Sequence, residues 1–496
     1  MIFLKKTKKM NESLLYLNPK SVWKNFVELT KIPRPSKKET LVVEFMKKWA
    51  KELNLEIIVD EVENVIIRKP ATPGYENRKT VILQGHLDMV PQKNSDKVHD
   101  FEKDPITAWI DGDWVKADGT TLGADNGIGV ALAMAILESK DIPHPPIEAL
   151  FTVDEETGMT GAFGLKPGIL KGDILINLDS EEEGALCIGC AGGINANIVY
   201  YYETEKPAEN STAYKVTIKG LKGGHSGVDI HLQRGNACKL MFRFLYNANK
   251  LFNIELSSFE VGNMRNAIPR EGWAIVSVPN NRTAEFEALI AQYSQIFTRE
   301  YKDSEDNLQF FAEKTDNPAF VIDSPTKDAL IQAIEATPNG VIRMELAMPN
   351  LVETSTNLSI VKLTEEKIEV IALIRSSVDT AKQDVVDTFE AIYNLSQADE
   401  VYFDGTYPGW KPEPNYDIVK IMEQTYKKMF NKEPHVYAIH AGLECGLFLG
   451  VYPHLEAISI GPDIRFPHSP DEKLNIQSVE KVWNFLVEVL KNTPAK

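Results

Sequence analysis

The chain has 496 residues, a length that predicts roughly two to four domains. Its composition, with 43% hydrophobic and 25% charged residues, is that of a folded globular protein and excludes wholesale disorder. The net charge of −17 argues against a nucleic-acid or anionic-membrane partner, because such partners are bound by surfaces rich in Lys and Arg. No stretch approaches the roughly 18 consecutive apolar residues of a membrane-spanning helix, and the apolar residues 1–4 are too few for a signal peptide. Four cysteines in so long a chain do not form a disulfide framework, so we expect a soluble, cytoplasmic protein.

The first part of the chain alternates between helix and strand patterns. Apolar residues at steps of three and four predict amphipathic helices at 19–29 and 38–53. Short apolar runs bounded by Gly, Pro or charged residues predict buried strands, and a strongly apolar segment between two of them predicts a helix: strands at 81–84, 147–153 and 173–178, and a helix at 126–139. This alternation predicts an α/β domain with a mixed sheet between helices.

The middle of the chain, residues 193–398, has a different order of elements that occurs twice. Each set consists of a strand, a helix, two strands and a helix. The first set is predicted at 213–219, 235–250, 255–261, 272–278 and 283–299, and the second at 308–313, 325–337, 356–363, 366–375 and 379–395. Two such βαββα units predict an α+β domain built by internal duplication.

The C-terminal part returns to the α/β pattern. Residues 396–415 are rich in Pro, Gly and acidic residues and predict a boundary. The elements predicted after it are a helix at 417–430, a strand at 455–460 and an amphipathic helix at 477–491. We therefore expect the domain of residues 193–398 to be inserted into an α/β domain formed by residues 1–192 and 399–496.

Five segments carry His or acidic residues directly after a strand or at the start of a helix. In open α/β sheets this edge is where ligands bind. The first three segments are GHLDMVP with His86 and Asp88, LGADNG with Asp125, and VDEETG with Glu155 and Glu156. Taken alone, each has an ordinary explanation, namely a surface His beside an Asp, a helix N-cap, and an acidic turn in solvent.

The remaining two segments complete the set. Asp179 ends the strand predicted at 173–178, and His468 lies in a loop between prolines after the strand at 455–460. A set of two His and several carboxylates favours a dinuclear Zn²⁺, Mn²⁺ or Co²⁺ site over a closed structural zinc site, which would use Cys. Two adjacent carboxylates after one strand also fit a general base beside a metal ligand.

These motifs together resemble the di-zinc metallopeptidase superfamily of aminoacylases, carboxypeptidases and dipeptidases, and within it the aminoacyl-histidine (Xaa-His) dipeptidases. The similarity runs almost from end to end and includes GHLDMVPQKN, TTLGADNGIG, ILINLDSEEEG, KGLKGGHSG, RNAIPRE, HAGLECGLF and HSPDE. It implies metal-dependent hydrolysis of unblocked dipeptides by an enzyme with two divalent ions, zinc first among them and Co²⁺ or Mn²⁺ as alternatives.

The resemblance also implies roles for individual residues. Each metal would have three protein ligands: His86, Asp125 and Asp179 for the first, and Asp125, Glu156 and His468 for the second. Asp125 would bridge the two metals, and Asp88 would orient the imidazole of His86. Glu155 would be the general base that acts on a metal-bridging hydroxide. The superfamily further implies a cis peptide bond between Asp125 and Asn126.

The inserted domain resembles the lid and dimerisation domain of the superfamily, which implies a homodimer formed through the lid. His225 in GGHSG would stabilise the oxyanion, a role that in relatives is often filled from the partner subunit. Asn266 and Arg375 are candidates for binding polar groups of the substrate, with Arg375 suited to a terminal carboxylate; a turn cap and a solvated strand charge are equal alternatives. Glu444 would contact the free amine of the substrate or make a buried structural hydrogen bond.

Two other functions stay open at this point. One is an N-acyl amino-acid amidohydrolase on the same scaffold, and the other is a catalytically silent dimer that uses its lid as a binding module. One local departure from the close relatives lies beside His468, where Asp463, Arg465 and Phe466 replace smaller or neutral residues. These side chains are expected to tune side-chain preference and to leave hydrolysis intact.

Overall fold

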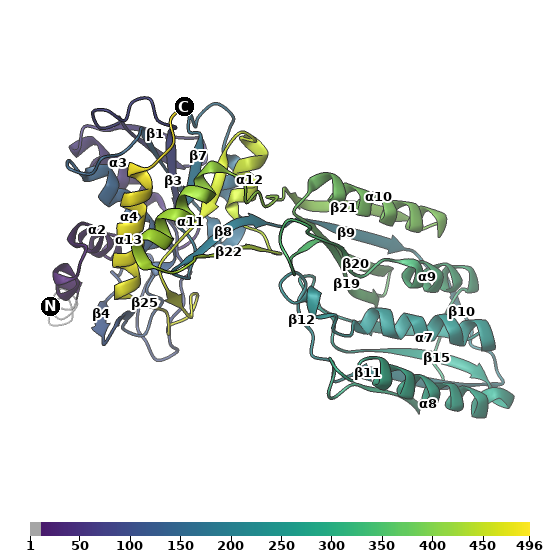
Figure 1. Ribbon diagram of the computed structural model, residues 1–496. Coiled ribbons are helices and arrows are strands. Elements are labelled where there is room, and N and C mark those ends of the chain that lie inside the picture. The colour runs from purple at the N-terminus through teal and green to yellow at the C-terminus, as the bar shows by residue number, and fades with distance from the viewer. Residues whose placement is uncertain (1–10) are drawn as a thin grey trace. The chain divides into compact units, whose positions relative to one another are not determined.

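A computed structural model of the chain describes residues 11–496 (Figure 1). The apolar run at residues 1–4 lies outside the described residues. The described chain forms two compact units. The first contains the residues up to Gly189 together with Pro412–Ala438 and Leu443–Lys496, and the second contains Cys190–Lys411 and Ile439–Gly442. Among the described residues, no helix combines the length and apolar character needed to cross a lipid bilayer.

The first unit is built on an eight-stranded mixed sheet. In spatial order its strands are β1 (Glu56–Val59), β2 (Val65–Lys69), β6 (Ile147–Thr152), β3 (Val81–His86), β7 (Ile174–Asn177), β23 (Glu456–Ser459), β8 (Ala185–Cys190) and β22 (His435–Ile439). The four central strands β6, β3, β7 and β23 are parallel to one another. Strands β1 and β2 are antiparallel additions at one edge. Parallel central strands are buried on both faces, which agrees with the continuous apolar runs in their sequences.

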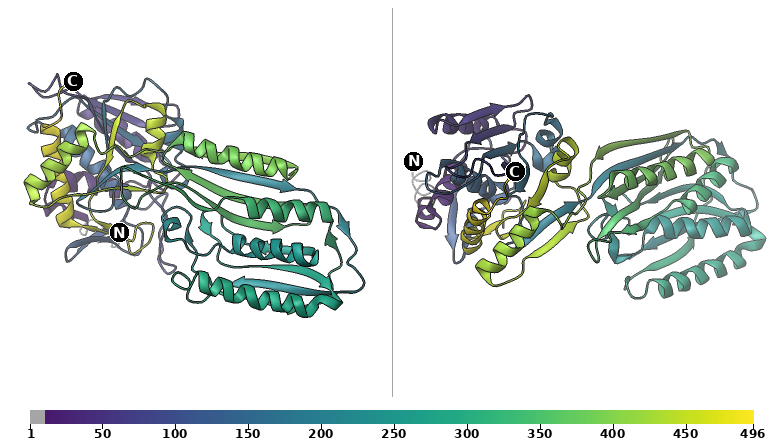
Figure 2. Two further views of the ribbon diagram at one scale, coloured as in Figure 1. Left: turned by 45° about the vertical axis from the view of Figure 1, so that its right-hand side comes forward. Right: turned by 45° about the horizontal axis from the view of Figure 1, so that its top comes forward.

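Helices pack around this sheet (Figure 2). They are α2 (Lys20–Thr30), α3 (Thr40–Glu52), α4 (Ala124–Glu138), α5 (Glu155–Gly158), α6 (Thr160–Gly164), α11 (Asp417–Phe430), α12 (Glu444–Val451) and α13 (Ile476–Lys491), with a 3₁₀ turn η1 (Leu14–Tyr16). Helix α4 contacts β3 and β6, while α2 covers α4. Because α4 is apolar on every side, it is buried along nearly its whole length.

A small four-stranded sheet completes the first unit. Its order is β24 (Ile464–Arg465), β25 (Lys473–Asn475), β5 (Trp114–Ala117) and β4 (Ala108–Asp111). The pairing of β25 with β5 attaches the C-terminal loop around His468 to the N-terminal part of the chain. Helix α13 then begins at Ile476, with the side chain of Asn475 accepting a hydrogen bond from the backbone of Ser478 as a cap.

The second unit is a layered α+β structure with one large antiparallel sheet. Its spatial order is β16 (Gln309–Lys314), β11 (Ser211–Lys219), β15 (Gly272–Pro279), β13 (Glu255–Val261), β19 (Val352–Leu363), β20 (Ile368–Ser376), β9 (Gly192–Tyr200) and β21 (Glu400–Tyr407), with β18 (Gly340–Met344) paired to β19. Four helices cover one face: α7 (Ala237–Phe252), α8 (Thr283–Glu300), α9 (Ser324–Ala336) and α10 (Asp379–Leu395) (Figure 2). Their apolar sides share one core with the sheet.

The predicted helices and strands agree with the observed ones to within a few residues, but several strands were missed. β1, β2, β8, β9, β21 and β22 have no counterpart in the prediction. β9 reads GGINANIVY, in which Gly and Asn interrupt the apolar alternation that identifies a strand. The observed mixed α/β architecture with several sheets confirms the predicted fold class of the first domain at this level.

Candidate metal centre

The carboxyl ends of neighbouring parallel strands carry the acidic and histidine residues of the first unit. β3 ends at His86, β6 is followed by Glu155 and Glu156, and β7 is followed by Asp179. Because β6, β3 and β7 are adjacent and parallel, these side chains emerge at one edge of the sheet. The loop after β23 brings His468 to the same place, although it follows this strand by nine residues.

The first group of donor atoms consists of His86, Asp125 and Asp179. The Nε2 atom of His86 lies 3.0 Å from Asp125 Oδ1 and 3.5 Å from Asp179 Oδ1. The His86 side chain is almost completely buried. One imidazole nitrogen therefore faces two carboxylates that come from different segments of the chain.

The second group consists of Asp125, Glu156 and His468. The Nε2 atom of His468 lies 3.1 Å from Asp125 Oδ2 and 2.9 Å from Glu156 Oε2. Hydrogen bonds to these two carboxylates raise the pKa of His468 to about 10. The imidazolium thus links the two carboxylates in the metal-free chain.

Asp125 belongs to both groups because its two oxygens face different imidazoles. Oδ1 contacts His86 and Oδ2 contacts His468. The peptide bond between Asp125 and Asn126 is cis, as the resemblance implies, and neither residue has helical backbone angles although both lie within α4. A carboxylate with one oxygen in each group has the geometry of a bridging ligand.

Asp88 lies behind His86 and is held on several sides. Its Oδ1 is 3.3 Å from His86 Nδ1, the nitrogen that points away from the other donors. Its oxygens also accept hydrogen bonds from the Ser36 hydroxyl and from the backbone N–H groups of Glu155 and Glu156. Burial would raise the pKa of Asp88, but contacts with His86 and Ser36 outweigh burial and bring the pKa to about 2. The ionised carboxylate of Asp88 therefore lies beside the Nδ1 atom of His86.

Glu155 is the first residue of α5 and lies against the donor groups without belonging to the two that share Asp125. Its carboxylate, His86 and Glu156 form a further set of mutually close donor atoms. Burial, reinforced by the negative charges of Asp179, Glu444 and Glu156, raises the pKa of Glu155 to about 9 despite the opposing charge of His86. A carboxyl group with so high a pKa is able to take up a proton near neutral pH.

Two buried carboxylate oxygens of the donor groups lack a hydrogen-bond donor. Glu156 Oε1 and Asp179 Oδ1 are buried and have no hydrogen-bond partner. Unpartnered buried carboxylate oxygens are costly in a folded protein, because they lose their hydration without compensation. Imidazole nitrogens and carboxylate oxygens, with no thiolate among them, are the donors that Zn²⁺, Mn²⁺ and Co²⁺ accept in open catalytic sites. The residues therefore fit two divalent cations.

The metal-free protein is expected to lose stability as the pH rises from about 5 to about 9. The pKa of Glu155 is about 9 in the folded chain against an ordinary value of 4.5, so only the folded chain keeps this proton across that range. The stability that this proton contributes is complete below pH 4.5 and is lost as the pH rises through about 9. Thermal unfolding of chelator-treated protein at pH 6 and at pH 9 checks this. An unfolding midpoint that is higher at pH 9 would contradict it, and Glu155→Gln is expected to flatten the dependence.

The second unit brings three predicted substrate-binding residues together. His225 in β12 (Gly224–His225) pairs with Ala267 in β14 (Ala267–Ile268), beside Asn266. His225 Nδ1 accepts hydrogen bonds from the backbone N–H groups of Gly227 and Val228. Burial, with the charge of Arg375 next, lowers the pKa of His225. The ring is therefore neutral with its proton on Nε2, which is free to donate.

Arg375 in β20 lies next to this histidine segment. Its side chain is buried and donates to the Tyr407 hydroxyl at 2.9 Å and to the Ser226 hydroxyl at 3.5 Å. The Nε atom of Arg375 is buried without a hydrogen-bond partner. Arg375 is thus not the solvated strand charge that the sequence left as an alternative, whereas the side chain of Asn266 is exposed.

Glu444 in the first unit makes the buried hydrogen bonds that were one of its two predicted possibilities. It starts α12 and is buried, and its Oε2 accepts hydrogen bonds from Gln84 and Thr152. Its Oε1 is buried without a partner. Burial, with the negative charge of Asp179 adding to it, raises the pKa of Glu444 to about 8, although the charge of His86 acts in the opposite direction.

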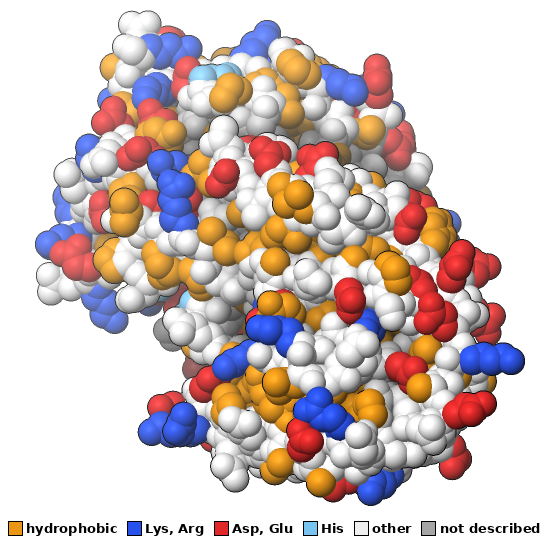
Figure 3. Space-filling model, turned by 90° about the vertical axis from the view of Figure 1, so that its right-hand side faces the viewer, with side chains coloured by type: hydrophobic (Ala, Val, Ile, Leu, Met, Phe, Trp, Pro, Cys, Tyr) orange, Lys and Arg blue, Asp and Glu red, His pale blue; other side chains and the backbone are white. Residues whose placement is uncertain are grey.

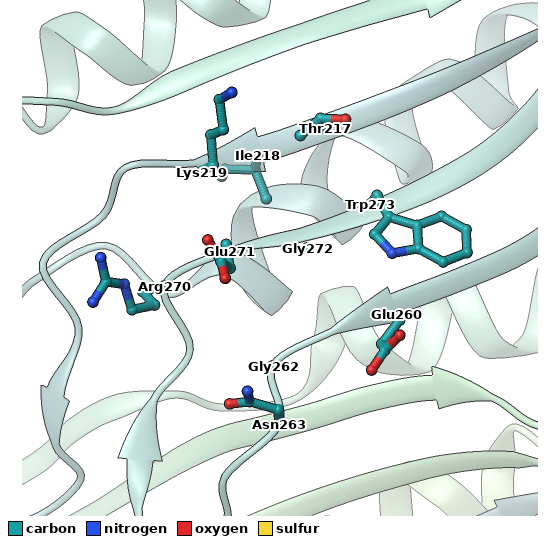
Figure 4. Close-up of a pocket in the computed structure, with 10 residues that line it drawn as sticks. All are labelled: Thr217, Ile218, Lys219, Glu260, Gly262, Asn263, Arg270, Glu271, Gly272 and Trp273. Atoms are coloured by element: carbon teal, nitrogen blue, oxygen red, sulfur yellow. The ribbon is translucent and has the colours of Figure 1, made fainter. Parts of the chain in front are cut away.

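A separate cavity of about 360 Å³ opens in the second unit between the ends of β11, β13 and β15 (Figure 4). Its lining includes Lys219, Glu260, Arg270 and Trp273. It contains no member of the donor groups and no predicted site residue. This cavity is therefore separate from the donor groups of the first unit.

Two buried charged residues of the first unit were not found by sequence reasoning. Arg34 contacts the segments that follow β3 and precede α4, and Glu472 contacts the start of α4. Arg34 lies in IPRPS and Glu472 in HSPDE. A single charged residue in a loop gives no periodic signal of burial, although the position of Glu472 four residues after His468 was a clue.

Comparison with known proteins gives concordant matches over nearly the whole chain. A family model described as Peptidase family M20/M25/M40 matches residues 82–492. The sequence is 46% identical over 483 residues to the cytosol non-specific dipeptidase of Escherichia coli (strain K12), covering 97% of this chain and 99% of the relative.

The solved structures give the same picture. The crystal structure of aminoacylhistidine dipeptidase from Vibrio alginolyticus is 44% identical in sequence, with a TM-score of 0.95 over 97% of this chain and 98% of that one. The aminopeptidase PepT from Bacillus cereus shares the fold at 15% identity, with a TM-score of 0.56 and coverage of 96% and 99% of the two chains.

Proposed function

The chain belongs to peptidase family M20/M25/M40, and from this membership we propose that it is a metal-dependent dipeptidase acting on unblocked dipeptides, Xaa-His among them. The names of its full-length relatives, a non-specific dipeptidase and an aminoacylhistidine dipeptidase, support this substrate class. The observation that carries the proposal is the pair of donor groups that share Asp125. An open site of this kind, rich in carboxylates, serves hydrolysis.

We propose two zinc ions as the cofactors, with Co²⁺ or Mn²⁺ as substitutes. His86, Asp125 and Asp179 would hold one ion, Asp125, Glu156 and His468 would hold the other, and Asp88 would orient His86. When bound, two such ions activate a water molecule and polarise the scissile carbonyl group.

Glu155 is the general base of the proposed reaction. It removes a proton from the attacking water molecule and transfers this proton to the amine that leaves. Its burial beside the donor groups supports this role, because a buried carboxylate holds a proton more readily than a solvated one.

The polar residues of the second unit are assigned to the substrate. His225 donates from Nε2 to the oxygen of the tetrahedral intermediate, which its neutral tautomer supports. Arg375 binds the C-terminal carboxylate, since its buried guanidinium retains an unpartnered Nε. Asn266, beside His225, binds a further polar group of the substrate. In the first unit, Glu444 Oε1 accepts a hydrogen bond from the free amine.

The second unit is assigned as an inserted lid domain that arose by duplication. We expected the insert at 193–398, and the second unit covers Cys190–Lys411 with four further residues. Reading its sheet outward from the central β13–β19 pair gives β13, β15, β11 and β16 on one side and β19, β20, β9 and β21 on the other. In the first set, α7 precedes β13 in the chain and α8 follows β15. In the second set, α9 precedes β19 and α10 follows β20 in the same order.

This order supports a duplication with boundaries that differ from those predicted from the sequence. Strand β16, which we expected to begin the second repeat, pairs with β11 at the edge of the first repeat. Strand β9, beside β20, has the place in the second repeat that β11 has beside β15 in the first. The first repeat therefore lies between β9 and α9 in the chain, as an insertion into the second.

We propose that the protein is a homodimer formed through this lid domain. Strand β21 is an edge strand of the large sheet, and an open edge offers unpaired backbone groups to a second copy. Exposed apolar side chains lie on and near it, namely Tyr201, Leu395 and Tyr402. On the face of the molecule drawn in Figure 3, exposed apolar side chains lie among charged ones.

The proposed location is the cytoplasm. The relative in Escherichia coli is named as a cytosolic enzyme. The four cysteines of this chain are all buried and none of them forms a disulfide, which suits a reducing compartment.

The dipeptidase assignment predicts a requirement for a free amino terminus of the substrate and for metal. A free dipeptide is expected to be hydrolysed at least about 100-fold faster than its N-acetylated form, because the acetyl group removes the ammonium that Glu444 would contact and leaves a buried carboxylate oxygen unpartnered. Chelation should abolish the activity, and Zn²⁺ should restore it. A preference for the acetylated substrate would identify an amidohydrolase. Loss of activity towards both substrates in metal-loaded protein would identify a silent binding protein.

A further inference from the structure

Two buried residues of opposite charge, Arg34 and Glu472, hold the backbone of the segments that carry the proposed metal ligands. Their side chains are 4% and 2% exposed, respectively. Neither is a member of the donor groups, and neither has a role in the proposed reaction. Buried charges are rare in proteins, so each requires a physical explanation.

Glu472 binds the start of α4. Its two oxygens accept hydrogen bonds from four successive backbone N–H groups, those of Leu122 (2.7 Å), Gly123 (2.9 Å), Ala124 (2.7 Å) and Asp125 (3.2 Å). The local N-cap residue is Gly123, which has no side chain to satisfy these groups. Glu472 therefore replaces a local cap and fixes the backbone of Asp125 directly.

Glu472 also lies in the segment that carries His468. Only three residues separate the two, and the backbone N–H of Glu472 donates to the carbonyl of Ser469, which closes a tight turn. Lys473, the next residue, begins β25, which is paired with β5. Through Glu472, the position of His468 is thus tied to the position of Asp125, and both are proposed ligands of the second metal.

Arg34 connects a different pair of segments. Its Nη1 donates to the carbonyl groups of Leu87 (2.9 Å) and Asp88 (2.8 Å), directly after His86. Its Nη2 donates to the carbonyl of Gly123, two residues before Asp125. Arg34 therefore ties the position of His86 to that of Asp125, and both are proposed ligands of the first metal.

The glycines of the Asp125 segment make room for this guanidinium group. A Cβ atom on Gly123 would lie 2.7 Å from Arg34 Nη2, and one on Gly127 would lie 2.5 Å from the same atom. Gly123 in addition has a φ of +67°, which other residues rarely adopt. Two glycines of LGADNG are thus explained by the presence of Arg34 and not by the metal ligands.

We propose that Arg34 and Glu472 are positioning residues with separate tasks. Arg34 sets the spacing of His86 and Asp125 for the first metal, and Glu472 sets the spacing of Asp125 and His468 for the second. The inference rests on the ligand assignment of the proposed function. The proposal goes beyond that assignment, because it states that two residues outside the donor groups control the affinity for each ion separately.

The test uses substitutions that retain side-chain volume. Glu472→Gln keeps the shape but turns an amide group toward N–H donors, and Arg34→Met keeps the stem but removes the donors. Glu148→Gln is a matched control, because Glu148 is also a buried carboxylate in the first unit that accepts from a backbone N–H and from an arginine, Arg68. Calorimetric titration of the chelated full-length variants with Zn²⁺ measures both affinities, and circular dichroism confirms folding.

Glu472→Gln is expected to lower the affinity for the second ion by about 10- to 100-fold, which is the usual effect of losing a contact that orients a ligand. In a His468→Ala background, where only the first ion remains, the same substitution should weaken binding of that ion to a smaller extent, because Asp125 is then the only ligand that Glu472 positions. Arg34→Met should instead lower the affinity for the first ion, which is the ion that remains in the His468→Ala background. Arg34→Lys should restore part of the affinity, since lysine retains a donor and the charge.

Three results would be informative in different ways. If each variant lowered the affinity for both ions equally, the proposal that the two residues have separate tasks would be overturned. Affinities as unchanged as those of Glu148→Gln would overturn any positioning role. If the wild-type protein itself failed to bind two ions, the ligand assignment of the proposed function would be wrong, and this outcome is separate from either of the other two.

Discussion

Asp125→Ala is expected to remove both metal ions and to lower kcat/KM for a free dipeptide by at least about 10³-fold. Each oxygen of Asp125 belongs to a different donor group, so one substitution takes a ligand from both sites at once. The loss of both ions removes several kcal/mol of transition-state stabilisation, which corresponds to a rate effect of this size.

The measurement is the metal content of the dialysed protein together with steady-state kinetics. Asp118→Ala is a suitable control, since Asp118 lies a few residues earlier, has a half-exposed side chain and forms an ion pair with Lys97. This control should retain two ions and near-normal activity. An Asp125→Ala protein that still bound two ions with ordinary affinity would exclude the bridging assignment.

Glu155→Gln is expected to lower kcat by about 10²- to 10⁴-fold while both ions remain bound. This range is the usual contribution of a positioned general base, and glutamine retains the size of the side chain but cannot take up the proton. KM is expected to change little, because Glu155 is not among the residues proposed to hold the substrate. The decisive measurement combines kcat, KM and the zinc content of one preparation.

The neighbouring residue provides an internal comparison. Glu156→Gln should lower the affinity for the second ion, since Glu156 contacts His468 and belongs to the same donor group as His468 and Asp125. Two adjacent glutamates are thus expected to fail in different ways, one in chemistry and one in metal binding. Near-normal turnover by metal-loaded Glu155→Gln would show that another group is the base.

The local pattern of the sequence determined the elements on which the site is built. The apolar runs at 81–84, 147–153 and 173–178 identified β3, β6 and β7, because buried parallel strands are apolar on both faces. The polar residues at the ends of these runs then indicated one sheet edge, a consequence of strand direction alone. The apolar segment at 126–139 likewise identified α4, apart from its irregular first turn.

Only the tertiary structure decided which segments meet. The order of β6, β3, β7 and β23 differs from their order in the chain, and no periodicity encodes it. His468 reaches Asp125 across 343 residues of sequence, and Glu472 reaches Ala124 across 348. The contacts of Arg34 and the place of β9 beside β20 are of the same kind. Hydrophobic periodicity records whether a residue is buried, whereas the partner of a buried charge depends on contacts between distant segments that form only when the whole unit packs.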